Sequence, residues 1–212
     1  IQTNKPELAL QSLERALELD PKSAEAHNVM GVLLEKDDDF VKAEQNYRKA
    51  LSLKSEYPQA RNNYGVLLYR LKRYKEAMEQ FSIAAADLSY ERRETALEYV
   101  GKIALMLGDK EKAKVTFERA LKLNSRLPEP ALELANFAYD EQNHPEANRF
   151  YQRYLRAIDK DAQSARGLWL GIRLARINHD SNALASYELA LKRLYANSEE
   201  YQAYLKSQNS GS

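Results

Sequence analysis

A small residue recurs along the chain at intervals close to 34 residues, and this repeat constrains the fold more than any other feature. Each copy begins with an alanine, which is followed four residues later by an aromatic residue or leucine and, in most copies, seven residues later by a second alanine. The leading alanines are Ala9, Ala43, Ala77, Ala113, Ala147 and Ala183, at spacings of 34, 34, 36, 34 and 36 residues. Repeats of this length indicate supersecondary units that bury their apolar faces against their neighbours.

A second set of small residues recurs at the same spacing as these leading alanines, which are called the alanine ladder below. The set comprises Gly31, Gly65, Gly101, Ala135 and Gly171, each preceded by a large apolar residue. We expect each copy to be a helix–turn–helix, with this small residue on the first helix (helix A) and the ladder alanine on the second (helix B). Small residues at both positions let the two helices approach closely, and the aromatic residue four positions on fills the space beside the crossing.

The combined pattern is the tetratricopeptide-repeat (TPR) signature, and six copies in phase predict an all-α, right-handed superhelical solenoid. Because the first copy shows only helix B, it is expected to be incomplete. We predict a single TPR array over residues 1–206 and a flexible tail at 207–212. The repeats are expected near 1–23, 24–57, 58–93, 94–127, 128–163 and 164–197, followed by a C-terminal capping helix at 198–206.

Composition excludes several classes of function. The chain has 212 residues, with 32 Lys and Arg against 31 Asp and Glu, so its net charge is +1 and a nucleic-acid partner is not expected. The same balance argues against an RNA-binding helical repeat, which usually has a basic face. The chain has no cysteine, and its three histidines have no second ligand at metal spacing. We expect no metal, no cofactor and no catalytic residues, and therefore a protein that is not an enzyme.

In a TPR, the second, fifth, sixth, ninth, twelfth and thirteenth positions of the repeat lie on helix A and line a concave groove. Amide side chains can hydrogen-bond the backbone of an extended peptide, and aromatic rings supply contact area at low entropic cost. The alternative is that the tryptophan and some of the tyrosines only pack between repeats. The predicted protein-binding residues of the groove are Asn28, Asn62, Asn63, Tyr69, Tyr99, Asn136, Tyr139 and Trp169.

A second candidate docking surface is the N-terminal edge. Leu8, Leu13 and Leu17 occur there at near-helical spacing, and no preceding helix A is present in this chain to cover them. A clamp for a C-terminal carboxylate, as in chaperone-binding TPRs, is not expected. Among the clamp positions only Asn63 matches.

Several stretches carry a more specific resemblance. They are Asn62–Gly65 with Lys72–Tyr74, then Gly171–Ala175, and then Lys192–Tyr195 followed by Ser198–Tyr201. With the six-copy layout, these stretches resemble the type IV pilus biogenesis TPR lipoproteins, the PilF/PilW pilotin family.

The resemblance implies a monomeric lipoprotein on the periplasmic face of the outer membrane of a Gram-negative bacterium. Its partner would be the pilus secretin subunit, whose localisation and multimerisation in that membrane the family assists. The acylated cysteine of the family, which attaches the protein to the membrane, would precede Ile1. The alternative is a generic bacterial TPR scaffold or cochaperone of the cytoplasm that binds an extended peptide in its concave groove.

Overall fold

The computed structural model describes residues 5–159 and 162–209, and within these ranges the chain forms twelve helices and no strand. The helices are α1 (Lys5–Leu19), α2 (Ala24–Lys36), α3 (Phe40–Leu53), α4 (Pro58–Arg70), α5 (Tyr74–Ala86), α6 (Arg93–Met106), α7 (Lys110–Leu123), α8 (Pro128–Asp140), α9 (His144–Ala157), α10 (Ala165–Ile177), α11 (Ser181–Leu194) and α12 (Glu199–Asn209). Four pairs of consecutive helices pack as the predicted hairpins: α2 with α3, α4 with α5, α8 with α9, and α10 with α11.

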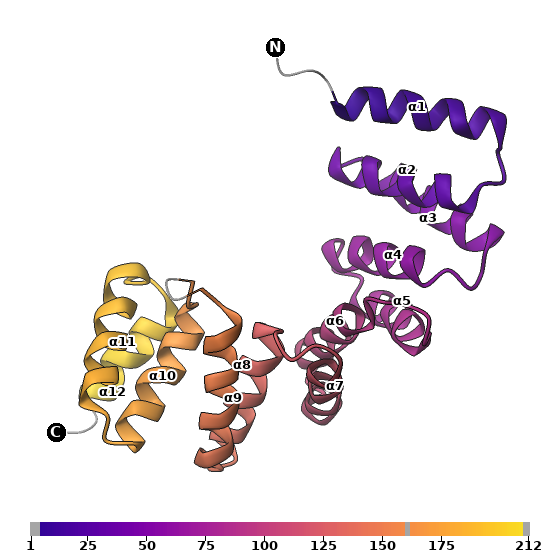
Figure 1. Ribbon diagram of the computed structural model, residues 1–212. Coiled ribbons are helices and arrows are strands. Elements are labelled where there is room, and N and C mark those ends of the chain that lie inside the picture. Colours follow the sequence, from indigo (N-terminus) through magenta and orange to yellow (C-terminus); the bar gives the residue numbers. More distant parts are fainter. Residues whose placement is uncertain (1–4, 160–161, 210–212) are drawn as a thin grey trace. The chain divides into compact units, whose positions relative to one another are not determined.

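The chain divides into two compact units, residues 1–116 and 117–212, and the boundary falls inside α7. In the first unit α1 packs against α2, and the α2–α3 and α4–α5 hairpins follow each other along the chain (Figure 1). In the second unit the α8–α9 hairpin precedes α10 and α11, and α12 packs against α10. A single array over 1–206 stays a prediction.

Short polar side chains and prolines define where the helices begin. Oγ of Ser23 accepts a hydrogen bond from the backbone N–H of Ala26 at the start of α2, and Oδ1 of Asp39 accepts one from Lys42 at the start of α3. These bonds satisfy backbone donors that the first helical turn leaves free. The side chains of Asn143, Ser164 and Asp180 make the same kind of bond at α9, α10 and α11.

The turn between helices A and B has the same backbone conformation in every hairpin. One residue of each turn has a positive φ, and the following N–H donates to a carbonyl of the preceding helix, as Asp39 does to Leu34 at 2.9 Å. This arrangement is the Schellman motif, which satisfies carbonyls at the end of the helix. The residues with positive φ are Asp38, Lys72, Gly108, Gln142 and His179.

The core confirms the predicted packing of small residues against aromatic rings. Ala43, Ala77, Ala113 and Ala147 are fully buried. Helix A therefore runs close to helix B, and the aromatic ring of helix B covers the glycine of helix A. Side chains of this size at these positions are what allow consecutive helices to interdigitate without voids.

In the sixth copy the predicted ladder is wrong by one residue. Asp39 caps α3 four residues before Ala43, whereas Asp180 caps α11 only three residues before Ala183. The residue four positions after the cap of α11, equivalent to Ala43 in α3, is therefore Leu184. The physical reason is that the segment before α10 is one residue longer than the alanine spacing indicates, so the whole hairpin is displaced along the sequence.

The glycine predicted to face helix B of the sixth copy does so, but it also faces the preceding helix. Gly171 lies against the hydroxyl of Tyr151 on α9 as well as against the ring of Tyr187 on α11. Ile172 is the residue that packs in the core with Leu191 of α11. The last hairpin thus has a core of large aliphatic residues where earlier hairpins have alanine and glycine.

The described residues begin in helix α1 and end in helix α12. Ser198 caps α12, as predicted, because its Oγ accepts a hydrogen bond from the N–H of Tyr201 at 3.1 Å, and Tyr204 packs into the core with Leu168. The helix continues to Asn209, so residues 207–209, predicted to belong to the tail, are helical, and 210–212 lie outside the described residues. At the other end Leu8 is 58% exposed on α1.

Candidate protein-binding site

The eight residues predicted to line a binding groove all lie on the first helix of a hairpin. Five of them are in the first unit, on α2, α4 and α6, and three are in the second unit, on α8 and α10. In the first unit Asn63 contacts Asn28, and Tyr69 contacts Tyr99. In the second unit all three predicted residues contact one arginine. The faces of these helices that carry the eight residues are called the helix-A faces below.

In the first unit, amide side chains connect α2 to α4. Nδ2 of Asn63 donates to Oδ1 of Asn28 at 3.0 Å, and Nε2 of Gln59 donates to Oδ1 of Asn63 at 2.8 Å. These three residues are the amide cluster. Each amide has two donor hydrogens and an oxygen that can accept two bonds, so Asn63 retains capacity for a ligand.

Two of the predicted residues contribute little surface. Asn28 and Asn62 are each 5% exposed. Oδ1 of Asn62 is buried and has no hydrogen-bond partner among the residues that the structure describes. Asn63, which is half-buried, is therefore the amide that a ligand on this face would reach.

Tyrosine rings from three helices meet around Tyr69, which lies on α4 as Asn63 does. The ring of Tyr69 on α4 packs edge-on against Tyr74 at 5.5 Å between centroids and against Tyr99 at 5.3 Å. Tyr99 also stacks on the buried ring of Phe81, at 4.5 Å and an interplanar angle of 3°. One face of Tyr99 is thus part of the core, and Tyr69 is the more available of the two predicted rings.

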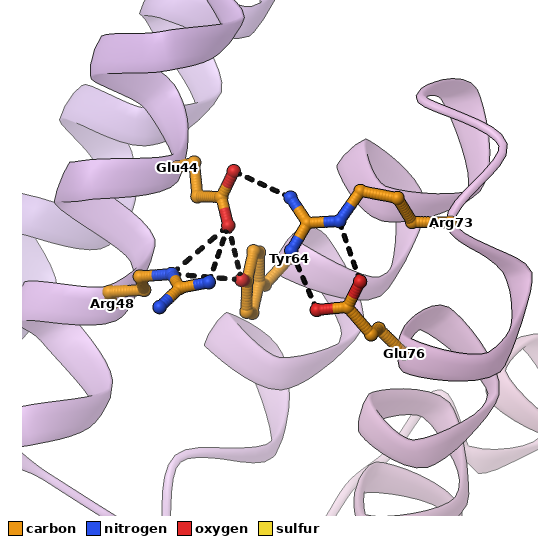
Figure 2. Close-up of polar contacts among 5 residues, drawn as sticks. All are labelled: Glu44, Arg48, Tyr64, Arg73 and Glu76. Atoms are coloured by element: carbon orange, nitrogen blue, oxygen red, sulfur yellow. Dashed lines mark hydrogen bonds and ion pairs between the residues drawn. The ribbon is translucent and has the colours of Figure 1, made fainter.

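Figure 2 shows a network of charged side chains that joins α3, α4 and α5 and that we did not predict from the sequence. Glu44 accepts hydrogen bonds from Tyr64 at 2.7 Å, from Arg48 at 2.8 Å and from Arg73 at 2.7 Å. Arg73 also bonds Glu76, at 2.6 Å. The pairs three or four residues apart are visible in the sequence, but the bonds between helices are not.

The network holds Glu44 in its ionised form. Partial burial works against ionisation, but the hydrogen bonds from Arg73, Tyr64 and Arg48 outweigh it and lower the pKa of Glu44 to about 2. Each of the five residues bonds at least one of the others. The network therefore fastens neighbouring hairpins together and does not form a site for chemistry.

In the second unit a forked ion pair connects α8 to α10. Nη1 of Arg166 lies 2.6 Å from Oε1 of Glu133, and Nη2 lies 3.0 Å from Oε2. Glu133 is 5% exposed, and the hydrogen bond to it raises the pKa of Arg166. Two parallel N–H···O bonds between these groups fix the orientation of both side chains.

The three predicted residues of the second unit surround an arginine that the prediction omitted. Nη2 of Arg173 donates to Oδ1 of Asn136 at 3.1 Å, and its guanidinium carbon lies 4.3 Å from the centroid of Tyr139 and 5.4 Å from that of Trp169. Burial lowers the pKa of Arg173. Its place was detectable in the sequence, because it follows Trp169 by four residues and so shares its helical face.

Nothing in the described ranges resembles a metal centre. No group of three or more His, Asp or Glu side chains there could hold a metal ion. His27 is bonded within the fold, with Nδ1 2.9 Å from Oδ1 of Asn46 and Nε2 3.2 Å from the carbonyl of Pro21. Among the described helices, none has both the length and the apolar character needed to cross a bilayer.

Comparison with known families agrees with this architecture. The tetratricopeptide-repeat family matches residues 1–58 and 39–92, and a second tetratricopeptide-repeat family matches residues 100–126. The chain is therefore an all-α TPR solenoid, as predicted from the repeat. Proteins of this class are scaffolds that bind other proteins, and the chain is not an enzyme.

Individual relatives specify the family. The type IV pilus assembly protein PilF of Pseudomonas aeruginosa is 39% identical over 204 residues, which cover 96% of this chain and 80% of that protein. The chain thus belongs to the PilF family of type IV pilus assembly proteins. This result confirms the resemblance seen in the sequence.

Solved structures support the same assignment. The structure of Pseudomonas aeruginosa PilF matches with a TM-score of 0.88 at 38% identity, covering 97% of this chain and 91% of that one. The structure of PilW, described as a widely conserved type IV pilus biogenesis factor, matches with a TM-score of 0.71 at 29% identity, covering 94% and 90%.

Proposed function

We propose that this protein is a pilotin, which binds the pilus secretin subunit and assists its localisation to, and multimerisation in, the outer membrane. The observation that carries the proposal is identity to PilF at 39% over nearly the whole chain. The pilotin role itself comes from the resemblance of the sequence to that family. A non-catalytic TPR array is a suitable scaffold for such a role, since it offers long helical faces for one extended partner.

The helix-A faces are the proposed docking surface. In the first unit, Asn63 offers an amide to the backbone of an extended segment, and Tyr69 offers a half-buried ring within the same unit. Both residues lie on α4, six positions apart, so they occupy neighbouring turns of one helix. A segment that runs along α4 could contact both.

The proposal includes attachment to the periplasmic face of the outer membrane through an N-terminal lipid, with the protein as a monomer. The lipid would keep the helix-A faces close to the membrane that the secretin must enter. The alternative, a generic bacterial scaffold or cochaperone, uses the same faces for a different peptide. The two differ in partner and compartment, not in fold.

A binding experiment with a blocked helix-A face tests the proposal. Val66 lies between Asn63 and Tyr69 on α4, three residues from each, so Val66→Arg adds a long charged side chain to that face without removing a packed ring. We expect the affinity of the purified protein for the secretin subunit of its host to fall at least about tenfold, because a blocked hot spot commonly costs ~2 kcal/mol.

The matched control is Val41→Arg, which makes the same change on α3, where Val41 is 71% exposed. We expect its affinity to stay within about twofold of the parent, as for most exposed substitutions. If the parent protein fails to bind the secretin, the proposed partner is wrong. If Val66→Arg binds as the parent does, the helix-A face of α4 is rejected and the N-terminal edge around Leu8 becomes the candidate.

A further inference from the structure

Arg173 leaves most of its hydrogen-bonding capacity unused. A guanidinium has five N–H donors, and Arg173 uses one of them, from Nη2 to Oδ1 of Asn136 at 3.1 Å. Its Nε is buried and has no partner among the residues that the structure describes. The acceptor is a neutral amide, which does not compensate the positive charge.

The nearby carboxylates are not available to Arg173. Within the described ranges none lies within 4.0 Å of its nitrogens, and Glu133, on the same pair of helices, is bound by Arg166. Asp140 acts on Arg173 only through a longer-range Coulombic attraction. A partly desolvated cation without a counter-ion is costly to keep in a fold, which indicates that the counter-ion comes from a ligand.

Three neighbours hold the guanidinium in place. The rings of Tyr139 and Trp169 lie 4.3 Å and 5.4 Å from its central carbon. Asn136 is itself fixed, because its Nδ2 donates to the carbonyl of Leu132 one turn back, at 3.0 Å. A cation held in this way loses little conformational entropy when it binds an anion.

We propose that Arg173, oriented by Asn136, Tyr139 and Trp169, is a binding site for a carboxylate on a protein segment that docks on the helix-A face of the second unit. A planar guanidinium binds a planar carboxylate through two parallel N–H···O bonds. The carboxylate is an Asp or Glu side chain within the segment, since the chain lacks all but one of the clamp residues with which chaperone-binding TPRs hold a C-terminus. The inference deepens the proposed function, because it names the chemistry of the docked segment on this face.

Trp169 provides a direct readout, because it is the only tryptophan of the chain. The probes are three pentapeptides: acetyl-Ala-Ala-Asp-Ala-Ala-amide, acetyl-pentaalanine with a free carboxyl terminus, and acetyl-pentaalanine amide, which has no carboxylate. Each is titrated into the full chain at constant ionic strength. We expect a saturable change in tryptophan emission with the aspartate peptide, and none with the amide.

The variants keep the test specific. Arg173→Gln removes the positive charge and should weaken the response to the carboxylate peptide at least about tenfold. Arg173→Lys keeps the charge but loses the two parallel N–H donors of the guanidinium, and should weaken the response less. Arg193→Gln makes the same charge change at an exposed position of α11 and should leave the response unchanged. Melting curves show whether each variant is folded. If Arg173→Gln does not fold, Arg173→Lys still tests the site.

The outcomes separate the two proposals. A stronger response to the aspartate peptide supports an acidic side chain as the ligand, and a stronger response to the free terminus overturns it in favour of a C-terminus. Equal responses to all three peptides, or an unchanged response in a folded Arg173 variant, overturn the carboxylate site. These results do not involve the secretin, so the pilotin proposal can fail while this inference holds, and the converse is also true.

Discussion

The ring of Tyr47 lies directly over Gly31. A Cβ added to Gly31 would be 2.7 Å from Cε1 of that ring, and the equivalent contact between Gly65 and Phe81 would be 2.9 Å. The hydroxyl of Tyr47 donates to Glu35 at 3.0 Å, and Glu35 in turn is bound by Arg70. The ring is therefore fixed by packing and by a hydrogen bond, and it cannot move aside for a larger residue.

This relationship predicts that Gly31→Ala destabilises the protein, although alanine is the better helix former. The alanine gains about 1 kcal/mol of helix propensity, whereas overpacking against a fixed ring costs about 1–3 kcal/mol. We expect the free energy of unfolding to fall by about 1 kcal/mol in urea titrations.

A double-mutant cycle isolates the ring as the cause. In a Tyr47→Leu background the obstruction is absent, so adding Gly31→Ala should be neutral or stabilising. If Gly31→Ala costs the same in both backgrounds, the contact with Tyr47 is not the reason for the glycine.

The network around Glu44 predicts a loss of stability in acid. The pKa of Glu44 in the folded state, about 2, is below its ordinary value of 4.5. A carboxyl with a depressed folded pKa contributes stability that is present above pH 4.5 and is lost as the pH falls toward 2. We expect Glu44→Gln to reduce the free energy of unfolding at pH 7 by about 1 kcal/mol, and the difference from the parent to shrink between pH 4.5 and 2.

Glu79→Gln is the control, because Glu79 is an exposed carboxylate on α5. Its effect should be small and nearly independent of pH. A Glu44→Gln variant whose deficit stays constant from pH 7 to pH 2 would show that the charge of Glu44 is not what stabilises the fold.

The ion pair between Arg166 and Glu133 predicts that replacing the arginine lowers the free energy of unfolding more than replacing the glutamate. Arg166→Met leaves the buried Glu133 without a cation and should cost about 2 kcal/mol, whereas Glu133→Gln leaves an arginine that water can reach and should cost less than about 1 kcal/mol. Chemical denaturation at pH 7 measures both. Combining Arg166→Met with Glu133→Leu should restore part of the loss, and equal costs for the two single variants would contradict the asymmetry in burial.

Truncating Tyr99 should destabilise the protein more than truncating Tyr69. Tyr99→Ala removes a ring that stacks on buried Phe81 and should lower the free energy of unfolding by about 2 kcal/mol, while Tyr99→Phe should keep most of it. Tyr69→Ala should cost less, because its ring contacts with Tyr74 and Tyr99 are edge-on and it does not stack on a buried ring. Thermal melting compares the three variants, and a larger loss for Tyr69→Ala than for Tyr99→Ala would contradict the assignment of Tyr99 to the core.

The repeat predicted most of the fold because the small residues are required by the packing of two helices that are consecutive in the sequence. A glycine on helix A and an alanine on helix B are required wherever two helices cross closely, so their spacing is visible in the sequence. The sixth copy departs from this spacing because the segment before α10 is one residue longer, which puts Ile172 and Leu184 where earlier copies have glycine and alanine. Gly171 contacts Tyr151 of α9 as well as Tyr187 of α11.

The site was only partly predictable, because its key contacts join distant residues. Asn136 and Tyr139 were identified from their repeat positions, but Arg173, which bonds Asn136, lies 37 positions further along the chain. Likewise Arg73 and Glu44 are 29 positions apart. Repeat positions show which face a residue occupies, and only the packed helices show which charges lie unpaired on that face.

The most direct test of the pilotin proposal is the amount of secretin multimer in the outer membrane of the host when this gene is deleted. We expect secretin subunits to be synthesised but multimers in the outer-membrane fraction to be strongly reduced, and to be restored by the parent gene and by Val41→Arg but not by Val66→Arg. Multimers that remain abundant and correctly located in the deletion strain would contradict the proposal.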